Sequence, residues 1–341
     1  MLALVFIGRH VVVQRASTRG GTPITGSYLA KRLLAVVPVL FGVTLVAFLL
    51  LQIVPGDPAV AILGPTATAE AVAQLRESLG LNQPVYVQYA RWLGKTLSGD
   101  MGDSIQMNIP VLPTLREKFA NTLILAAASF VLAVVVGAGL GLLAAARPHT
   151  RFDRAFMSTA VVGASMPSFW IALMLMFVFA LKLRLLPATG MYDITGDQEL
   201  GDLLRHLVLP AAVTAMVPTA IIARMARASL IEVMHQDYIT ACLAKGLPYW
   251  RVVAKHGVRN ALPPIVNITG LQLGYLLGGA VYTEVVFSWP GIGLQLYSSI
   301  VARDIPMVQA TVLLVGLGFV VVNVVVDLLL VRLVPRATTA A

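Results

Sequence analysis

The sequence predicts an all-α, polytopic membrane protein with six transmembrane helices and a small external helical subdomain after the first of them. Of its 341 residues, 58% are hydrophobic and only 12% are charged, about half the charged share of a soluble domain. In addition, six stretches contain no charged residue, and each is near or above the length of about 20 residues that a helix needs to cross a bilayer. They are Leu33–Gly56, Phe119–Ala146, Ala155–Leu181, His206–Ala223, Asn260–Thr283 and Ile305–Val326.

The chain begins with a segment, residues 1–27, that we expect to be a cytoplasmic extension, disordered or amphipathic. Its apolar start, Met1–Ile7, is too short to span a bilayer. The first transmembrane helix is predicted over residues 28–56. The single cysteine of the chain, Cys242, excludes an intramolecular disulfide framework.

An external subdomain is predicted over residues 57–118. A short helix over Leu75–Leu81 stops at Gly80, and an amphipathic helix follows over Pro84–Leu97. The segment, which includes Tyr86, Tyr89 and Trp92, carries enough apolar surface to pack on itself, and it could pack on the membrane helices as a lid.

The remaining chain, residues 119–336, is predicted to form the main membrane domain, with residues 337–341 as a C-terminal tail. Gly137, Gly139 and Gly141 favour close packing of the second span. Pro167 is predicted to kink the third span. The fourth span is the shortest, and we expect its helix to continue past Arg224 and Arg227.

The distribution of basic residues predicts the orientation in the membrane. Segments 1–32, 147–154, 224–259 and 332–336 carry 16 of the 25 Lys and Arg but only three acidic residues. The positive-inside rule therefore places these segments, and with them both termini, in the cytoplasm. This topology accounts for the net charge of +9, and no aromatic-interleaved basic patch indicates a nucleic-acid partner.

The polar loop 235–265 interrupts the second half of the chain. Asp237 is predicted to cap a short helix whose apolar side is Tyr238, Ala241, Cys242 and the stem of Lys245. Gly246 would end that helix, and a second helix over Tyr249–Val258 would lead to a break at Pro263-Pro264. Such a loop suits either a soluble partner or the lipid headgroups.

A family resemblance rests on this loop. Thr240-Ala241-Cys242, followed after three residues by Gly246, resembles the EAA loop of ABC-importer permeases, and Asn260-Ala261-Leu262-Pro263 resembles its end. The Asp237-Tyr238 start looks most like the B-type subunit of the dipeptide/oligopeptide/nickel branch. A second match runs from Glu284 to Gly293, and the resemblance covers about Tyr28–Arg336.

The resemblance implies a type I ABC importer permease of the bacterial inner membrane, for di- or oligopeptides above other substrates, which performs no catalysis. It implies as partners a second related permease, two ATP-binding-cassette ATPases that bind the ATP and Mg, and an extracytoplasmic substrate-binding protein. The resemblance also implies that this binding protein docks on the external subdomain, with Tyr86, Tyr89, Trp92 and Asp100 as candidate docking residues. No cofactor or metal is expected on this chain. The residues expected to couple to the ATPases are Asp237, Tyr238, Thr240, Ala241, Cys242, Ala244, Lys245, Gly246, Leu247, Asn260, Leu262 and Pro263.

The substrate pathway is expected to be weakly selective, with Ser165, Met166, Ser168, Gln272 and Tyr275 as its candidate lining. The alternative function is an ion-coupled secondary transporter or channel, which would keep ionisable residues near the middle of its spans. No such residue lies in the centre of any span. A membrane enzyme is the third alternative, but the five histidines form no metal-spaced pair and no nucleotide-binding P-loop is present.

Overall fold

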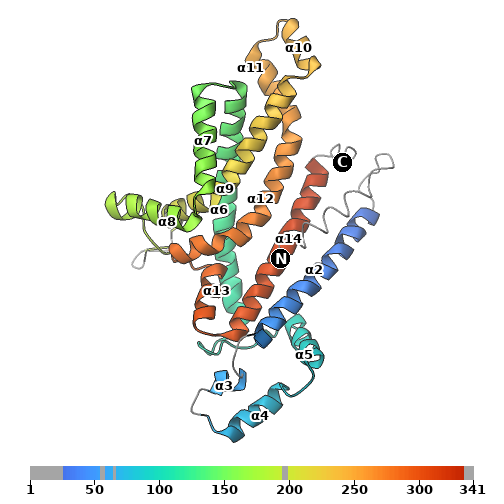
Figure 1. Cartoon of the computed structure of the whole chain (residues 1–341), viewed down its shortest axis with the longest axis vertical. Helices are drawn as coiled ribbons and strands as arrows, with labels where there is room; N and C mark the ends of the chain where they lie inside the picture. Colours follow the sequence, from blue (N-terminus) through green and yellow to red (C-terminus); the bar gives the residue numbers. More distant parts are fainter. Residues whose placement is uncertain (1–25, 54–57, 64–66, 194–198, 334–341) are drawn as a thin grey trace.

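Long helices packed side by side form the body of the molecule in a computed structural model. The structure describes residues 26–53, 58–63, 67–193 and 199–333. The predicted N-terminal extension and C-terminal tail therefore lie almost entirely outside the described residues. Figure 1 shows α10 and α11 at one end of the bundle and α3, α4 and α5 at the other, which we call the loop end and the subdomain end.

The described chain is helical almost throughout, and its one β-bridge, Asp103 with Pro110, belongs to no named strand. The helices are α2 (Gly26–Ile53), α3 (Pro58–Leu63), α4 (Ala69–Leu79), α5 (Val85–Leu97), α6 (Val111–Ala146), α7 (Arg151–Ser165), α8 (Ser168–Leu175), α9 (Leu200–Met234), α10 (Asp237–Ala244), α11 (Tyr249–Val252), α12 (Arg259–Val286), α13 (Ile292–Val301) and α14 (Ile305–Leu333). Two π-helical segments, η1 (Met176–Lys182) and η2 (Val253–Val258), continue α8 and α11.

Four continuous described helices are long and apolar enough to cross a membrane: Val111–Ala146, Leu200–Met234, Tyr249–Val286 and Ile305–Val326. They contain four of the six predicted spans, and α9 continues past Arg224 and Arg227 as expected. The first predicted span coincides with α2, whose described apolar part is Val36–Leu49. Counting the bent third span as one gives five, so the structure supports the polytopic all-α fold but not a count of six.

The third predicted span is broken at Pro167 rather than kinked. Helix α7 ends at Ser165, and the helix formed by α8 and η1 leaves it at 108°. Proline has no backbone N–H, so it cannot bond the carbonyl of Gly163. That carbonyl accepts a hydrogen bond from the N–H of Met166 instead, at 3.4 Å. Figure 1 shows the resulting arm projecting sideways from the bundle.

The predicted break at Pro263-Pro264 is wrong, because α12 runs through both prolines. The helix from Tyr249 to Val286 is continuous, with η2 immediately before the turn that contains them. A π-helical segment changes which carbonyls need a donor, and such local adjustments let membrane helices accommodate proline. The predicted second loop helix is thus the first part of the fifth span.

Helices α6 and α9 pack closely enough for their backbones to meet. A Cβ atom added at Gly141 would lie 2.5 Å from the carbonyl oxygen of Ala223, and one at Gly137 would lie 2.8 Å from that of Thr219. Small residues are what allow helix backbones to approach in a membrane. Gly139, in contrast, has open space around it, so two of the three glycines expected to pack do so.

The subdomain end is fastened to the membrane helices in two places. Tyr89 of α5 hydrogen-bonds Thr44 of α2 at 2.8 Å and stacks edge-on against Phe48. The buried carboxylate of Asp304, before α14, accepts hydrogen bonds from the Ser104 hydroxyl and the N–H of Ile105. The predicted helices before and after Gly80 are confirmed, and Gly80 has the expected left-handed conformation with φ +70°.

Candidate functional site

The polar loop folds back on itself at Gly246. Helix α10 ends at Ala244, and Gly246 adopts φ +78°, a left-handed conformation that glycine reaches without a Cβ penalty. Pro248 then precedes the first turn of α11. The predicted helix, glycine turn and helix are therefore all present, and they form the tip of the molecule at the loop end (Figure 1).

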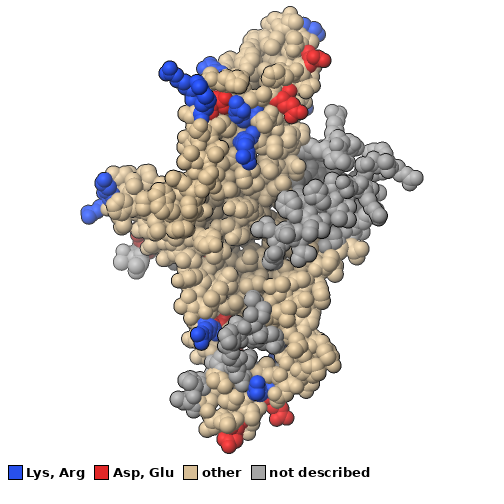
Figure 2. All heavy atoms as spheres, in the orientation of Figure 1, with Lys and Arg blue, Asp and Glu red and all other residues tan. Residues whose placement is uncertain are grey.

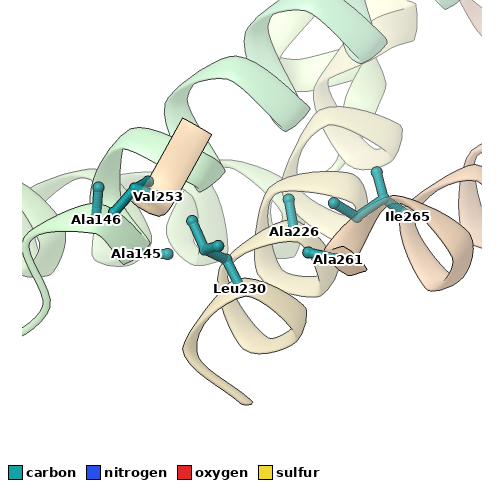
Figure 3. Packing of buried hydrophobic residues seen from close by; sticks show 7 residues of the cluster. All are labelled: Ala145, Ala146, Ala226, Leu230, Val253, Ala261 and Ile265. Carbon is teal, nitrogen blue, oxygen red and sulfur yellow. The ribbon is translucent and has the colours of Figure 1, made fainter. Parts of the chain in front are cut away.

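A core of buried apolar side chains supports the loop from beneath. Leu230 of α9 and Val253 of η2 belong to it, and both are at most 4% exposed. Figure 3 shows the residues of the cluster, which come from α6, α9, η2 and α12. The complete cluster is Ala145, Ala146, Ala226, Leu230, Val253, Ala261 and Ile265. Helices α6, α9 and α12 all contribute side chains to this core. Because a close-packed core transmits strain, a displacement of the loop would act on these three long helices together.

Polar and aromatic contacts fix the orientation of the loop on this core. The hydroxyl of Tyr249 donates to the carbonyl of Ala146 at 2.8 Å, which joins α11 to the end of α6. The side-chain amide of Asn260 donates to the hydroxyl of Tyr238 at 3.0 Å, which joins the base of α12 to α10. The guanidinium of Arg147 lies 5.3 Å above the ring of Trp250, a cation–π contact.

Most residues predicted to couple to the ATPases lie on an exposed face of this loop. Tyr238, which belongs to the predicted set, is 42% exposed, and its neighbours Leu243 and Trp250 are 39% and 48% exposed. The tip of the loop therefore exposes several large apolar side chains. The predicted residues that are exposed are Asp237, Tyr238, Thr240, Ala241, Ala244, Lys245, Gly246, Asn260 and Leu262, whereas Cys242, Leu247 and Pro263 are half-buried.

Two details of the loop prediction are wrong. The residue that anchors α10 is Ile239, which is fully buried, whereas the side predicted to be apolar, Tyr238 and Ala241, faces outward. Asp237 is the first residue of the helix and not its cap: Gln236 occupies the cap position, without a side-chain capping bond. Tertiary packing decides which side of the short helix α10 is buried. The eight residues of the helix alone therefore could not show which side faces the core.

A groove of about 520 Å³ between α7 and α9 is a second feature of the loop end. At its mouth, Arg227 forms a bidentate ion pair with the buried carboxylate of Asp153, with Nε–Oδ1 at 2.6 Å and Nη2–Oδ2 at 2.8 Å. The same carboxylate accepts the N–H of His149 at 2.9 Å. Arg154 and Arg224 also line the groove. Sequence analysis placed Arg227 only on the extension of the fourth span and missed its pairing with Asp153, which lies 74 residues away.

The candidate pathway residues do not come together as one surface. Ser165 lines the groove, and Met166 beside it is 40% exposed, with Ser168 half-buried at the start of α8. On α12, Tyr275 is 48% exposed, but Gln272 is 8% exposed and thus faces the interior of the single chain. The pathway lining remains a prediction, and Ser165 is the member that the structure connects to a cavity.

The candidate docking residues of the external subdomain separate into two kinds. Tyr89 and Trp92 are half-buried and pack on Phe48 of α2, which agrees with the lid alternative. Tyr86 is 74% exposed, and Asp100 is exposed in a turn where it accepts the N–H of Gly102. Of the four candidates, these last two are exposed in the described chain.

Titratable groups also meet near the start of α9. The Nδ1 atom of buried His206 lies 3.1 Å from Oδ1 of Asp202, and its Nε2 atom lies 3.7 Å from Oδ1 of Asp193. These three residues line a cavity of about 310 Å³ together with Arg184 and Arg205. Their ligand atoms lie within 4.8 Å of one another, close enough for a metal ion, and the two arginines bring positive charge to the same cavity.

Comparison with known proteins gives consistent matches along the chain. Residues 137–339 match the family described as "Binding-protein-dependent transport system inner membrane component", and residues 26–128 match the corresponding N-terminal family. The dipeptide transport system permease protein DppB of Alkalihalophilus pseudofirmus is 40% identical over 328 residues, covering 91% of this chain and 98% of the relative.

The glutathione transport system permease protein GsiC of Escherichia coli (strain K12) is 39% identical over 309 residues, again covering 91% of this chain and 98% of the relative. Among solved structures, an inward-facing conformation of the MetNI methionine ABC transporter matches with a TM-score of 0.52 and 22% identity. That match covers 67% of this chain and 98% of the solved chain, so the two share a fold.

Proposed function

Because the chain belongs to the family of binding-protein-dependent transport system inner membrane components, we propose that it imports peptides as one half of a translocation pathway. The chain itself is a multi-pass, non-catalytic permease subunit of an ABC importer of the inner membrane. Two curated relatives of similar length are a dipeptide permease and a glutathione permease. Both substrates are peptides, which supports a peptide as the cargo here.

The observation that carries the mechanism is the exposed tip formed by α10, Gly246 and α11 on the shared core of α6, α9 and α12. The tip exposes Tyr238, Leu243 and Trp250, and aromatic side chains of this kind anchor protein interfaces. In our proposal this coupling loop seats in an ATPase subunit. A movement of the ATPase is then transmitted through the core to three long helices.

The proposal requires partners. A second, related permease completes the pathway, and two ATP-binding-cassette ATPases bind ATP and Mg and hydrolyse the nucleotide. An extracytoplasmic binding protein delivers the peptide to the subdomain end, where Tyr86 and Asp100 are exposed. Alternating access follows if closure of the ATPases moves the two permeases against each other.

The proposed orientation puts the loop end and both termini in the cytoplasm. Figure 2 shows Lys and Arg gathered at the loop end, together with a few acidic side chains. Next to it, the described surface in view is a broad belt without charge, apart from the tip of the arm formed by α8 and η1 and acidic atoms at the edge below that arm. An uncharged belt of this kind is what the hydrocarbon core of a bilayer requires. The excess of basic residues at the loop end supports its cytoplasmic placement.

The test is affinity purification of the tagged chain from native membranes, followed by mass spectrometry of its partners. In the variant Gly246→Val, a β-branched residue must adopt φ +78°, which costs about 1–3 kcal/mol locally and reshapes the loop. We expect two ATPases and a second permease to copurify with the wild type, and the ATPases to be lost from the variant.

Two controls separate the loop conformation from general damage. Gly246→Asn retains a residue that tolerates the left-handed region, and Gly201→Ala places a methyl group in open space on α9. Both variants are expected to keep the ATPases. A chain that purifies alone and transports substrate in liposomes without ATP would overturn the proposal in favour of an ion-coupled transporter.

A further inference from the structure

We propose that the groove between α7 and α9 is the cytoplasmic exit of the pathway, where Arg154 and Arg224 bind carboxylate groups of the cargo. The inference rests on the proposed function and adds the substrate chemistry that this exit favours. The groove extends along α7 from Arg154 to Ser165, which is roughly 16 Å of helix. It therefore connects the broken middle of the third span with the loop end.

The helix break indicates that the inner end of the groove contains water or protein rather than lipid. Ser165, Met166 and Pro167 are exposed in the single chain at the point where α7 ends. Irregular backbone within the hydrocarbon region occurs only where it is buried in protein or lines a water-filled cavity. Ser165 itself lines the groove, so in our proposal the groove is the water-filled space at this break.

Between its arginines and Ser165, the walls of the groove are mostly apolar, with small side chains at Ala164 and Ala220 and hydroxyl groups at Ser158 and Ser165. The Ser165 hydroxyl donates to the carbonyl of Val161 at 2.8 Å. The groove's volume of about 520 Å³ is within the range of small-molecule sites. A dipeptide-sized cargo fits a space of this size.

The charges at the mouth select for anions. Three arginines line the groove against one acidic residue, Asp153, and that carboxylate is already held by Arg227. Arg154 and Arg224 are exposed and have no acidic partner within the described part of the chain. A guanidinium group binds a carboxylate through two parallel hydrogen bonds. Every linear peptide carries a C-terminal carboxylate, so this site fits the proposed cargo.

The experiment measures how charged reagents reach the groove. In a Cys242→Ser background, Ala164→Cys places a thiol on the groove wall, and the full importer complex is reconstituted in nanodiscs. The probes are two water-soluble methanethiosulfonates, one with a sulfonate and one with a trimethylammonium group. We expect both to react and the anionic reagent to be favoured, with Arg224→Gln lowering the anion-to-cation rate ratio about fivefold.

Matched variants make the result specific. Arg224→Lys keeps the charge and is expected to keep the ratio, as is Arg116→Gln, which removes an exposed arginine from the subdomain end of α6. If neither charged reagent reaches the thiol introduced by Ala164→Cys while a membrane-permeant maleimide reacts with it, the groove is filled by lipid and the inference is overturned. An unchanged ratio in Arg224→Gln would overturn the carboxylate site.

The cargo is tested separately in proteoliposomes that contain the same complex and its binding protein. ATP-driven uptake of a labelled dipeptide by the wild type supports the proposed function. We expect Arg224→Gln to slow this uptake by several-fold and Arg224→Lys to restore it in part, because lysine keeps the charge but not the two parallel hydrogen bonds. If the wild type imports no peptide but still reacts faster with the anionic reagent, the proposed peptide import is overturned, whereas the anion-favouring groove is still supported.

Discussion

The carboxylate of Glu284 lies fully buried where α6, α12 and α13 meet. It accepts hydrogen bonds from the hydroxyl of Thr122 at 2.6 Å and from the N–H groups of Gly293 and Leu294 at 2.6 and 3.2 Å. Gly291 leaves no room for a side chain, because an added Cβ would lie 2.3 Å from the Glu284 carboxyl carbon. The residue thus fastens the start of α13 to two long helices.

Substitution of Glu284 tests this structural role. Glu284→Ala is expected to lower the free energy of unfolding by about 3 kcal/mol, because two buried N–H groups lose their acceptor and a cavity forms. Glu284→Gln keeps an oxygen for those N–H groups, so a smaller loss of about 1 kcal/mol is expected. The thermal midpoint of the purified protein in detergent measures both. Equal loss in the two variants would contradict the role assigned to the acceptor oxygen.

The ion pair between Asp153 and Arg227 leads to a second prediction at the scale of residues. Arg227→Ala leaves the Asp153 carboxylate, 3% exposed, without its counter-ion, and is expected to cost about 3 kcal/mol. The single variant Asp153→Asn and the double variant Asp153→Asn, Arg227→Ala complete the set, and the double variant, which removes both charges, is expected to recover much of that loss. Thermal midpoints of the two single variants and the double variant form the cycle. Additive losses would show that the ion pair does not couple α7 to α9.

Among the helices, the contact of α6 with α9 depends on glycine at particular turns. A Cβ at position 141 would lie 2.8 Å from the Cα of Ala223 as well as near its carbonyl, and backbone atoms cannot move aside as a side chain can. Gly141→Ala is therefore expected to cost at least about 2 kcal/mol, by forcing the helices apart.

Gly139 provides the matched control on the same helix, because nothing lies within 4 Å of an added Cβ there. Gly139→Ala is expected to leave the thermal midpoint unchanged or to raise it slightly, since alanine favours the helix. Monodispersity on size-exclusion chromatography and the midpoint are measured for both variants. A similar fall in the thermal midpoint of Gly139→Ala and Gly141→Ala would contradict the close contact of α6 with α9 at Gly141.

The sequence allowed the helices to be predicted where hydropathy alone decides them, but not where proline does. Pro167 stands alone and Pro263 is followed by Pro264, yet the single proline ends a helix with a bend of 108° and the pair lies within a continuous helix. The difference comes from tertiary contacts. Ile171 and Ala172 after the bend pack on Leu209 and Phe287, whereas η2 precedes Pro263. Neither this packing nor the π-helical segment can be read from the local sequence.

At the scale of the whole molecule, the sequence likewise predicted some features of the coupling loop and missed others. The loop, its glycine turn and most of its exposed residues could be predicted, because turn chemistry is local. The buried anchor Ile239 and the contact of Tyr249 with Ala146, more than a hundred residues away, could not, since they depend on how α6, α9 and α12 come together. The groove at Arg224 was missed for this reason too.

The orientation of the whole molecule can be tested with its single cysteine. Cys242 lies half-buried on the coupling loop, so a membrane-impermeant maleimide should reach it from the cytoplasm. We expect labelling in inside-out vesicles from which the ATPases have been stripped, and none in right-side-out vesicles. Adding the ATPases back should protect the thiol, because our proposal seats this loop in them.

A second thiol at the opposite end of a long helix gives the reciprocal result. Gly201 begins α9, is exposed and has open space around it, whereas Cys242 follows the other end of the same helix. In Cys242→Ser, Gly201→Cys, labelling is therefore expected only in right-side-out vesicles, and the ATPases should not affect it. Labelling of both thiols from one side would contradict a membrane-spanning α9. Reversed sides would leave the fold intact and overturn the cytoplasmic placement of the coupling loop.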